Sequence, residues 1–376
     1  MTEHLSRIPS GMRYYVGEEA RLRGAVENCA MSVFDGWSYE EVITPSVDYY
    51  ALFEQGMGAE AHRAFRFTDS DGRMLALRPD ITSSVARAAA TLLADHPRPL
   101  RLCYAGPVFR QQRVSHVEWL RETTQLGCEL IGVGGGIADL EVLLIATEIL
   151  ERLGLRGSSC ITINNVEVLN GVAENLELDE EARERMRGLI DIRDTAELER
   201  FLVGYKTTPQ ERQVFSRLTQ LAGKGEILNK ARSVITNERS VAALDALKAL
   251  WDAIESLGLQ ELFEIDLGDA SGLDYYTGLV FKVFVHGLGA RVGRGGRYDR
   301  LIADFGRPEP AIGFILDLDG LTEILRQREL GSLLFETPNP EPIKFAAASE
   351  MFREAKAKRA NGKRIQIKLG EIKNHD

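Results

Sequence analysis

The order of strand and helix patterns along the chain restricts its fold more than any other feature of the sequence. Short apolar segments typical of strands occur before residue 164, vanish between 165 and 262, and return from 263. Within that interval apolar residues recur at helical spacing, as in SVAALDALKALWDAIESLG. Strand-rich, helix-rich and strand-rich segments in this order are expected when one sheet domain is interrupted by another. The sequence therefore predicts an α+β fold with a helical insertion.

These patterns divide the chain into four parts. We assign 1–164 and 263–330 to the two halves of one core, 165–262 to the insertion, and 331–376 to a linker with a short basic tail. Helices are predicted at about 18–35, 138–153 and 318–326, and strands at 38–43, 73–77, 100–109, 125–131, 263–267, 279–285 and 311–316.

Composition excludes several classes of protein. The chain has 376 residues and a net charge of −10, from 46 basic and 56 acidic side chains, which disfavours non-specific nucleic-acid binding. Its four cysteines and six histidines form no CxxC or HxxxH pattern, so we expect neither a disulfide framework nor a metal site. No signal peptide and no run of about 18 apolar residues is present, so we expect a cytoplasmic protein without a membrane span.

The tail has the opposite charge from the rest of the chain. Segment 353–368 contains seven basic side chains and a single acid, Glu354. A solvated helix face and strand is the favoured interpretation, and nucleic-acid contact is the alternative. Only Phe345 and Phe352 are available there to stack on bases.

Polar side chains interrupt the apolar strands in four segments: LRPDITSSVAR, VFRQQ with RETTQLGCELIG, SGLDYYTGLVF and GRGGRYDRLI. In a buried strand such side chains are costly unless they are paired. Taken singly, each of these polar side chains can be interpreted as a core residue with a satisfied hydrogen bond. The neighbouring glycines can be interpreted as parts of tight turns. The residues concerned are Arg78, Arg110, Gln125, Glu129, Asp274, Tyr275 and Tyr276.

Together these segments resemble the class II aminoacyl-tRNA synthetase core, and within it histidyl-tRNA synthetase. SGLDYYTGLVF and GGRYDRLI resemble the two histidine signatures of that family, and VFRQQ with QLGCELIG resembles its motif 2. WSYEEVITPSVDYYALFEQGMG is similar to motif 1, the segment that forms the dimer. The resemblance covers about 8–325. It implies a mixed, mostly antiparallel sheet flanked by helices, and a homodimer formed through about 36–58.

The resemblance also implies a histidine pocket. Asp80, Thr82, Gln125 and Glu129 would surround the amino end of the ligand, although Asp80 stands where the synthetase pattern has a glutamate. Tyr275, Tyr276 and Tyr298 would supply hydroxyl groups near the ring, because an imidazole needs hydroxyl or carboxylate partners. Arg110 matches the arginine of motif 2 beside this pocket. The predicted histidine-binding residues are Asp80, Thr82, Arg110, Gln125, Glu129, Tyr275, Tyr276 and Tyr298.

The nucleotide side of the synthetase pattern is incomplete. Gln112, Ser271 and Gly320 stand where the family has an acid and two arginines. Losing two transition-state donors would slow adenylation by roughly 10⁴–10⁶-fold, so we expect this chemistry to be lost. Arg121, Arg291 and Arg294 remain candidates for binding an anion, and Arg291 or Arg294 could substitute for a missing arginine. With Arg297, the last two form a basic cluster that could instead be solvated or paired with carboxylates.

The features that a synthetase uses to bind tRNA are also incomplete in this sequence. About 45 residues follow Leu330, fewer than an anticodon-binding domain needs, and the insertion holds 18 acidic and 13 basic residues. This combination resembles the regulatory subunits of ATP phosphoribosyltransferase, the first enzyme of histidine biosynthesis. The resemblance implies a non-catalytic chain that binds no cofactor. This chain would activate a short-form catalytic subunit within a hetero-octamer. L-histidine would be its allosteric ligand.

Other interpretations remain open at this stage. The chain could be a divergent or truncated histidyl-tRNA synthetase, a histidine-activating relative, or an RNA-binding sensor that uses the basic tail. Segment 131–141 has the strand, glycine loop and helix of a dinucleotide site, but Ile137 occupies the third glycine position and a plain strand–helix turn explains it. His116 could be catalytic, although an exposed loop position is favoured.

Overall fold

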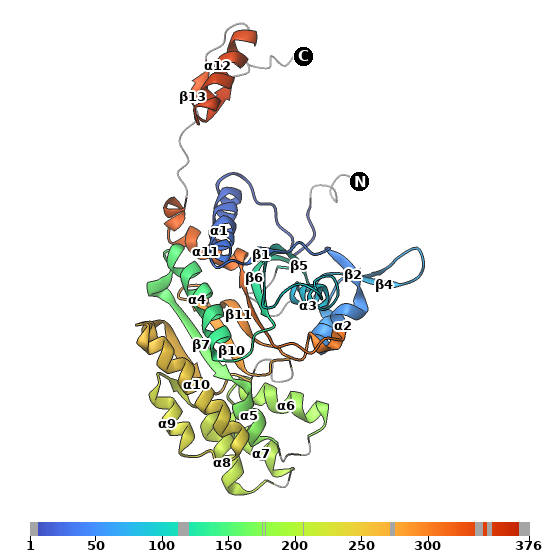
Figure 1. Ribbon diagram of the computed structural model, residues 1–376, viewed down its shortest axis with the longest axis vertical. Helices are drawn as coiled ribbons and strands as arrows, with labels where there is room; N and C mark the ends of the chain where they lie inside the picture. Colours follow the sequence, from blue (N-terminus) through green and yellow to red (C-terminus); the bar gives the residue numbers. More distant parts are fainter. Residues whose placement is uncertain are drawn as a thin grey trace. The chain divides into compact units, whose positions relative to one another are not determined.

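A nine-stranded sheet is the main element of the first of two units into which the chain divides, Met1–Gly331 and Ser332–Asp376 (Figure 1). The computed structural model describes residues 7–111, 120–174, 176, 178–205, 207–270, 275–334, 341–343 and 348–367. The strands of this sheet are β1 (Glu40–Glu41), β5 (Leu100–Phe109), β6 (Glu122–Ile131), β7 (Ser159–Asn165), β8 (Ala222–Gly223), β9 (Phe263–Asp266), β10 (Leu279–Val285), β11 (Arg291–Arg297) and β12 (Ala311–Asp317).

The strand order in this sheet is β1-β5-β6-β12-β11-β10-β7-β9-β8. β1 pairs with β5 and β7 pairs with β9 in parallel, and the other neighbouring pairs are antiparallel. A second sheet joins β2 (Val47–Tyr49), β4 (Met74–Leu77) and β3 (Arg66–Thr68) in antiparallel order. The predicted mixed, mostly antiparallel α+β fold is confirmed.

Helices cover both faces of the large sheet. The helices of the first unit are α1 (Gly17–Gly36), α2 (Tyr50–Met57), α3 (Thr82–Ala90), α4 (Gly136–Arg152), α5 (Val166–Val172), α6 (Glu180–Asp191), α7 (Thr195–Val203), α8 (Pro209–Leu218), α9 (Glu226–Arg232), α10 (Glu238–Ser256) and α11 (Leu318–Gln327), and α12 (Ala348–Ala360) belongs to the second unit. Short 3₁₀ segments are η1 (Gly58–Arg63), η2 (Arg156–Ser158), η3 (Gln260–Leu262), η4 (Ala303–Phe305) and η5 (Leu330–Leu333). α1 packs on α4 and α11 beside β5 and β6, whereas α3 packs on the opposite face.

The apolar stripe of α1 explains its position. Leu22, Val26, Ala30, Val33 and Phe34 follow the spacing of one helix face, and all five side chains are buried. The helix ends where Gly36 and Trp37 turn the chain, and Ser38 adopts a positive φ of 63°. The predicted helix at 18–35 is therefore present.

Polar caps define the helices that lie between β7 and β9. Thr208 and Glu211 form a capping box at the start of α8, with Pro209 in the first turn. Asn237 caps α10, which then packs against α4 and α5. Figure 1 shows α5 to α9 gathered beyond β7, on the side of the sheet away from α1.

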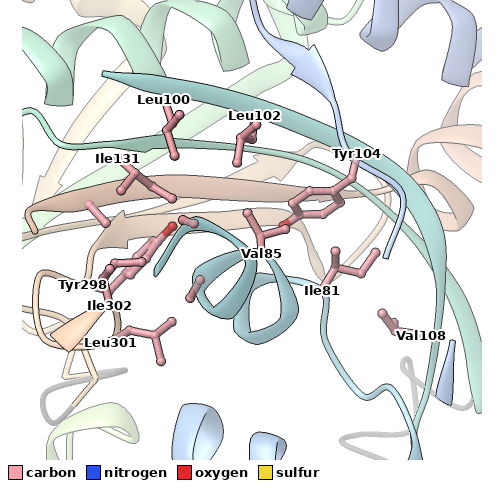
Figure 2. Close-up of a cluster of buried hydrophobic side chains, with 13 residues drawn as sticks. Ile81, Val85, Leu100, Leu102, Tyr104, Val108, Ile131, Tyr298, Leu301 and Ile302 are labelled. Carbon is pink, nitrogen blue, oxygen red and sulfur yellow. The ribbon is translucent and has the colours of Figure 1, made fainter. Parts of the chain in front are cut away.

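A second apolar cluster fills the space between α3 and the sheet. It contains Ile81, Val85, Leu100, Leu102, Tyr104, Val108, Ile131, Tyr298, Leu301 and Ile302 (Figure 2). Two of its members, Tyr104 and Tyr298, are buried tyrosines whose hydroxyl groups need partners. The cluster therefore ends in polar groups on this face of β6.

Four strands of the large sheet differ from the sequence-based prediction. The strand expected at 38–43 is reduced to Glu40–Glu41, because Ser38 has a left-handed backbone and Pro45 soon follows. β7 and β11 were not predicted. β11 contains Gly293, Gly295 and Gly296, which disfavour a strand in isolation, yet it lies between β10 and β12. A two-residue strand, β8, also lies within the segment predicted to be helical.

The second unit contains a small βαβ arrangement. β13 (Glu341–Ile343) pairs in parallel with β14 (Ile365–Ile367), and α12 connects them. Ile343, Met351 and Ala355 form its buried cluster. Among the residues that the structure describes, no helix in either unit has the length and apolar character that crossing a membrane requires.

Candidate functional site

The candidate site is built on β6, at the face that α3 covers. Gln125, Gly127 and Glu129 alternate along this strand, and Gln125 and Glu129 are 4% and 1% exposed. A Cβ atom at Gly127 would lie 2.6 Å from Cζ of Tyr104, so glycine leaves space for that ring. Gly313 of β12, opposite Glu129, leaves space in the same way, because its Cβ would lie 1.7 Å from Oε2 of Glu129.

Glu129 accepts three hydrogen bonds inside this site. Thr82 donates its hydroxyl to Oε1 at 2.8 Å, Tyr104 donates to the same oxygen at 2.9 Å, and Tyr298 donates to Oε2 at 2.5 Å. Burial raises the pKa of Glu129 to about 7. The charge of the nearby Asp80 also raises this pKa, whereas the three hydrogen bonds lower it. Near neutral pH the site therefore holds a carboxyl group that a cationic ligand would ionise.

The loop before α3 positions Asp80 and Thr82. Arg78, which is 5% exposed, donates to the carbonyl oxygens of Thr44 and Pro107, both at 2.7 Å. Arg78 thereby fixes this loop between β5 and the segment before β2. Asp80 accepts bonds from the backbone N–H and the hydroxyl of Ser83 at 3.2 and 3.1 Å. Burial raises the pKa of Asp80, and these two bonds oppose that effect.

Three tyrosines form the opposite side of the site. The rings of Tyr275 and Tyr276 meet edge to face with centroids 4.9 Å apart, and Tyr275 stacks on Tyr298 at 5.8 Å. Burial raises the pKa of all three hydroxyl groups, so they stay protonated near neutral pH. Because Tyr298 donates to Glu129, the tyrosine group and the carboxylate group belong to one network.

These residues surround a cavity of about 420 Å³, which we call the acidic cavity. It is lined by the predicted residues Asp80, Thr82, Gln125, Glu129, Tyr275, Tyr276 and Tyr298, and also by Arg291 and Arg294. Oε1 of Gln125 is buried and has no hydrogen-bond partner among the residues that the structure describes. A buried acceptor without a partner is costly, so this oxygen marks a position where a ligand donor would be stabilised.

Arg110 is the predicted pocket residue that lies apart from this cavity. It lines an adjacent cavity of about 230 Å³, which we call the basic cavity, together with Arg121, Arg291 and Arg294. Its Nε donates to the carbonyl oxygen of Pro79 at 3.1 Å, so it supports the loop that carries Asp80. Gln125, Arg291 and Arg294 line both cavities.

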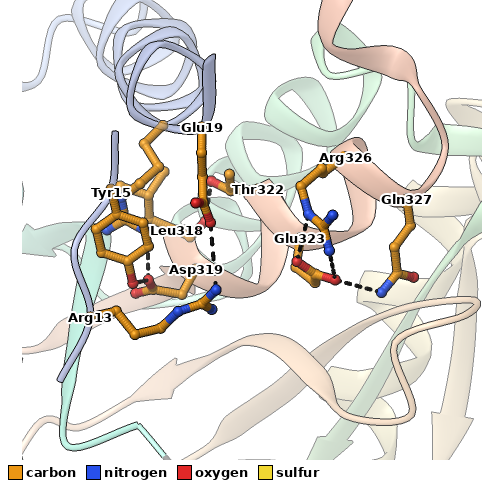
Figure 3. A network of polar contacts seen from close by, with 10 residues as sticks. Arg13, Tyr15, Glu19, Leu318, Asp319, Thr322, Glu323, Arg326 and Gln327 are labelled. Atoms are coloured by element: carbon orange, nitrogen blue, oxygen red, sulfur yellow. Dashed lines mark hydrogen bonds and ion pairs between the residues drawn. The ribbon is translucent and has the colours of Figure 1, made fainter. Parts of the chain in front are cut away.

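Carboxylates of α11 and the strand before it also line the basic cavity. Asp319 accepts bonds from Tyr15, from Arg23 and, at 2.9 Å, from the backbone N–H of Thr124. Glu323 binds Arg326 at 2.7 Å and Gln327 at 2.8 Å, as Figure 3 shows. Gly320 lies between these two acids, at the position where the synthetase pattern has its motif 3 arginine.

Three further features of this region were not identified in the sequence. Tyr104 donates to Glu129, but a tyrosine in a strand is too common to draw attention. Asp269 lines the acidic cavity and is paired with Lys282 at 2.8 Å. Asp191, the last residue of α6, also lines this cavity, and only the three-dimensional fold brings it there.

The basic cluster predicted near β11 is divided in the structure. Arg297 is 7% exposed and binds Asp139 at 2.5 Å and Asp299 at 3.2 Å. It also donates to the carbonyl oxygen of Gly135, which ties down the glycine loop before α4 and agrees with a structural role for that loop. Gln112, His116, Ser271 and Asp274 lie outside the described residues.

Comparisons with known proteins agree with this arrangement. A family model described as histidyl-tRNA synthetase matches residues 11–321. The ATP phosphoribosyltransferase regulatory subunit of Moorella thermoacetica is 37% identical over 316 residues, which are 84% of this chain and 81% of that protein. The chain belongs to the histidyl-tRNA synthetase-like family of ATP phosphoribosyltransferase regulatory subunits. The resemblance inferred from the sequence motifs is thereby confirmed.

Other relatives extend this similarity. The regulatory subunit of Clostridium kluyveri is 32% identical over 98% of this chain and 93% of its own length. A solved structure of an ATP phosphoribosyltransferase regulatory subunit/histidyl-tRNA synthetase from Bacillus halodurans covers 97% of this chain and 94% of its own, with a TM-score of 0.85 and 28% identity. A histidyl-tRNA synthetase from Nostoc, with a TM-score of 0.78 over 98% of this chain and 87% of its own, is 21% identical and supports the fold alone.

Proposed function

We propose that this chain is a non-catalytic regulatory subunit of ATP phosphoribosyltransferase. It activates the short-form catalytic subunit and lets L-histidine inhibit the first step of histidine biosynthesis. The names of its relatives support the regulatory role. The observation that carries the histidine part is the acidic cavity, where the buried Glu129 accepts bonds from Thr82, Tyr104 and Tyr298.

The chemistry of this cavity suits a free amino acid with a polar ring. An ammonium group needs anionic or carbonyl acceptors, which Asp80 and the buried Oε1 of Gln125 supply. An imidazole needs hydroxyl or carboxylate partners, which Tyr275, Tyr276 and Glu129 supply. L-histidine carries both groups, and no cofactor is needed for it to bind.

The basic cavity supports a loss of adenylation chemistry. Gly320 cannot supply the charge of the motif 3 arginine. We infer that histidine binds and is not activated, so the ligand acts as a signal for the catalytic partner.

The proposed assembly contains four regulatory and four catalytic subunits, built from homodimers of this chain that form through about 36–58. The exposure of Ile43, at 87%, and of Tyr49, at 46%, supports a contact through this segment. The mass of the chain in solution, alone and with its catalytic partner, tests both stoichiometries.

Activation can be tested by measuring phosphoribosyl transfer to ATP with the short-form catalytic subunit from the same genome. We expect that subunit to be inactive alone and to gain activity when this chain is added, because the relatives are named as its regulatory subunits. Titrating the chain should give saturation at one subunit per catalytic subunit. No gain on mixing two folded proteins would contradict the proposal.

A second candidate is a histidine-activating enzyme of the synthetase type. Arg110 and Arg121, which match synthetase positions, favour it because both line the basic cavity. Histidine-dependent exchange of pyrophosphate into ATP by this chain alone would support that function. We expect no exchange above background.

A further inference from the structure

An amino-acid ligand in the acidic cavity leaves one group without an assigned partner. The ammonium and imidazole groups meet acceptors there, but a carboxylate needs a cation. The synthetase pattern has an arginine at the position of Ser271, which lies outside the described residues. Serine cannot supply a positive charge. The cation has to come from elsewhere in the chain.

Among the residues that the structure describes, four basic side chains line the acidic cavity: Arg63, Lys282, Arg291 and Arg294. Lys282 is already paired with Asp269 at 2.8 Å, and the charge of Arg63 is balanced by its ion pair with Glu60, although Nη2 of Arg63 has no hydrogen-bond partner among the described residues. Arg291 is also engaged in an interaction with another group of the chain. The side chain of Arg294, by contrast, forms no hydrogen bond or ion pair with any residue that the structure describes.

The position of Arg294 gives it access to a ligand. It is half-buried in β11, a central strand of the sheet, opposite Lys282 of β10 and Ile315 of β12. It lines both the acidic and the basic cavity, beside Gln125, which also lines both. Its positive charge acts on Asp80, Tyr275 and Tyr276, which are the side chains expected around the ligand.

We propose that Arg294 binds the carboxylate of the amino acid in the acidic cavity and replaces the synthetase arginine lost at Ser271. Gln125 and Asp80 then hold the ammonium group beside it, and Glu129 with the tyrosines holds the ring. This inference rests on the proposed function, because it names how the same histidine site recognises one end of its ligand.

Recognition through Arg294 makes the site selective for free α-amino acids. Histidinol, which has an alcohol in place of the carboxylate, and histamine, which has neither, would leave the guanidinium without its counterion. A charge-assisted hydrogen bond of this kind corresponds to about a 10- to 100-fold change in affinity. A sensor of this kind binds the amino acid more tightly than its reduced or decarboxylated analogues.

The test is calorimetric titration of L-histidine, histidinol and histamine into the purified chain at pH 8. For the wild-type chain we expect histidine to bind at least about 10-fold more tightly than either analogue. Arg294→Gln should weaken histidine binding about 10- to 100-fold and leave histidinol binding within about 3-fold, so that the preference disappears. Arg294→Lys should restore part of the preference, because its charge is kept and its planar fork is lost.

Arg300→Gln is the matched control, because Arg300 is exposed and lines neither cavity. Thermal unfolding of each variant checks that the chain remains folded. The inference is overturned if folded Arg294→Gln keeps the preference for histidine over histidinol. It is also overturned if that variant loses both ligands equally, as a merely structural role would predict. A wild-type chain that binds no histidine would instead refute the proposed function on which the inference rests.

Discussion

Replacing Glu129 by glutamine is expected to weaken L-histidine binding by about 100-fold or more. Glutamine has nearly the shape of glutamate and can still accept bonds from Thr82 and Tyr104, so the site should keep its form. What it lacks is the negative charge in a buried position, where a bond to a charged group contributes most to affinity. Calorimetric titration of histidine into the folded variant measures the effect.

Glu122→Gln is the appropriate control for this prediction. Glu122 begins the same strand, β6, but lies outside both the acidic and the basic cavity. Its replacement should leave histidine affinity unchanged within about 2-fold, since no direct contact is lost. Equal affinity of wild type and Glu129→Gln would place the histidine site elsewhere in the molecule.

The same replacement is expected to stabilise the chain at alkaline pH. Burial raises the pKa of Glu129 from an ordinary value near 4.5 to about 7. Between these pH values the folded chain keeps the proton and the unfolded chain has lost it, so unfolding releases a proton. The free energy of unfolding therefore falls as the pH rises from 4.5 to 7, by about 3 kcal/mol from this group. Glutamine does not titrate and avoids that loss.

The measurement is urea unfolding of both chains at several pH values between 4.5 and 8, without histidine. The difference between Glu129→Gln and wild type isolates this group, because the other titrating residues contribute to both chains. We expect the variant to gain about 3 kcal/mol on wild type between pH 4.5 and 8 and little beyond. A constant difference in the free energy of unfolding across this range would mean that the pKa of Glu129 is the same in the folded and the unfolded chain. Burial would then not destabilise the charged form of Glu129.

Much of the sheet could be predicted because its strands are long and apolar. The strands predicted at 100–109 and 279–285 coincide with β5 and β10. β11 was missed because Gly293 and Gly295 carry no strand preference. The folded chain needs them, since a Cβ at Gly295 would lie 2.5 Å from the carbonyl oxygen of Gly313. Such a requirement is created by neighbouring strands and is invisible in the local sequence.

The candidate site was predictable where polar residues interrupt an apolar pattern. Gln125 and Glu129 stood out in β6 for this reason, and both line the acidic cavity. Tyr104 and Gly313 did not stand out, because a tyrosine or a glycine in a strand has many ordinary explanations. Arg294 and Arg297 looked alike in the sequence. The structure pairs Arg297 with Asp139, whereas Arg294 forms no ion pair with a described residue.

The separation of Arg110 from the acidic cavity has a similar cause. In the sequence it belongs to the same motif as Gln125 and Glu129. The strand pairing of β5 and β6 brings Arg110 next to Arg121 at their common end, where the backbone N–H of Arg110 donates to Arg121 at 2.8 Å. Both side chains then line the basic cavity. Sequence proximity to a motif did not determine which cavity a side chain enters.

The most direct test of control through the acidic cavity is to titrate L-histidine into the reconstituted phosphoribosyl-transfer reaction with wild-type chain and with Glu129→Gln. Each curve is expressed relative to the activated rate of its own complex. We expect wild-type complex to be inhibited, and the variant complex to need about 100-fold more histidine for the same fractional inhibition. Superimposable inhibition curves, with both chains folded and bound to the catalytic subunit, would contradict control through this cavity.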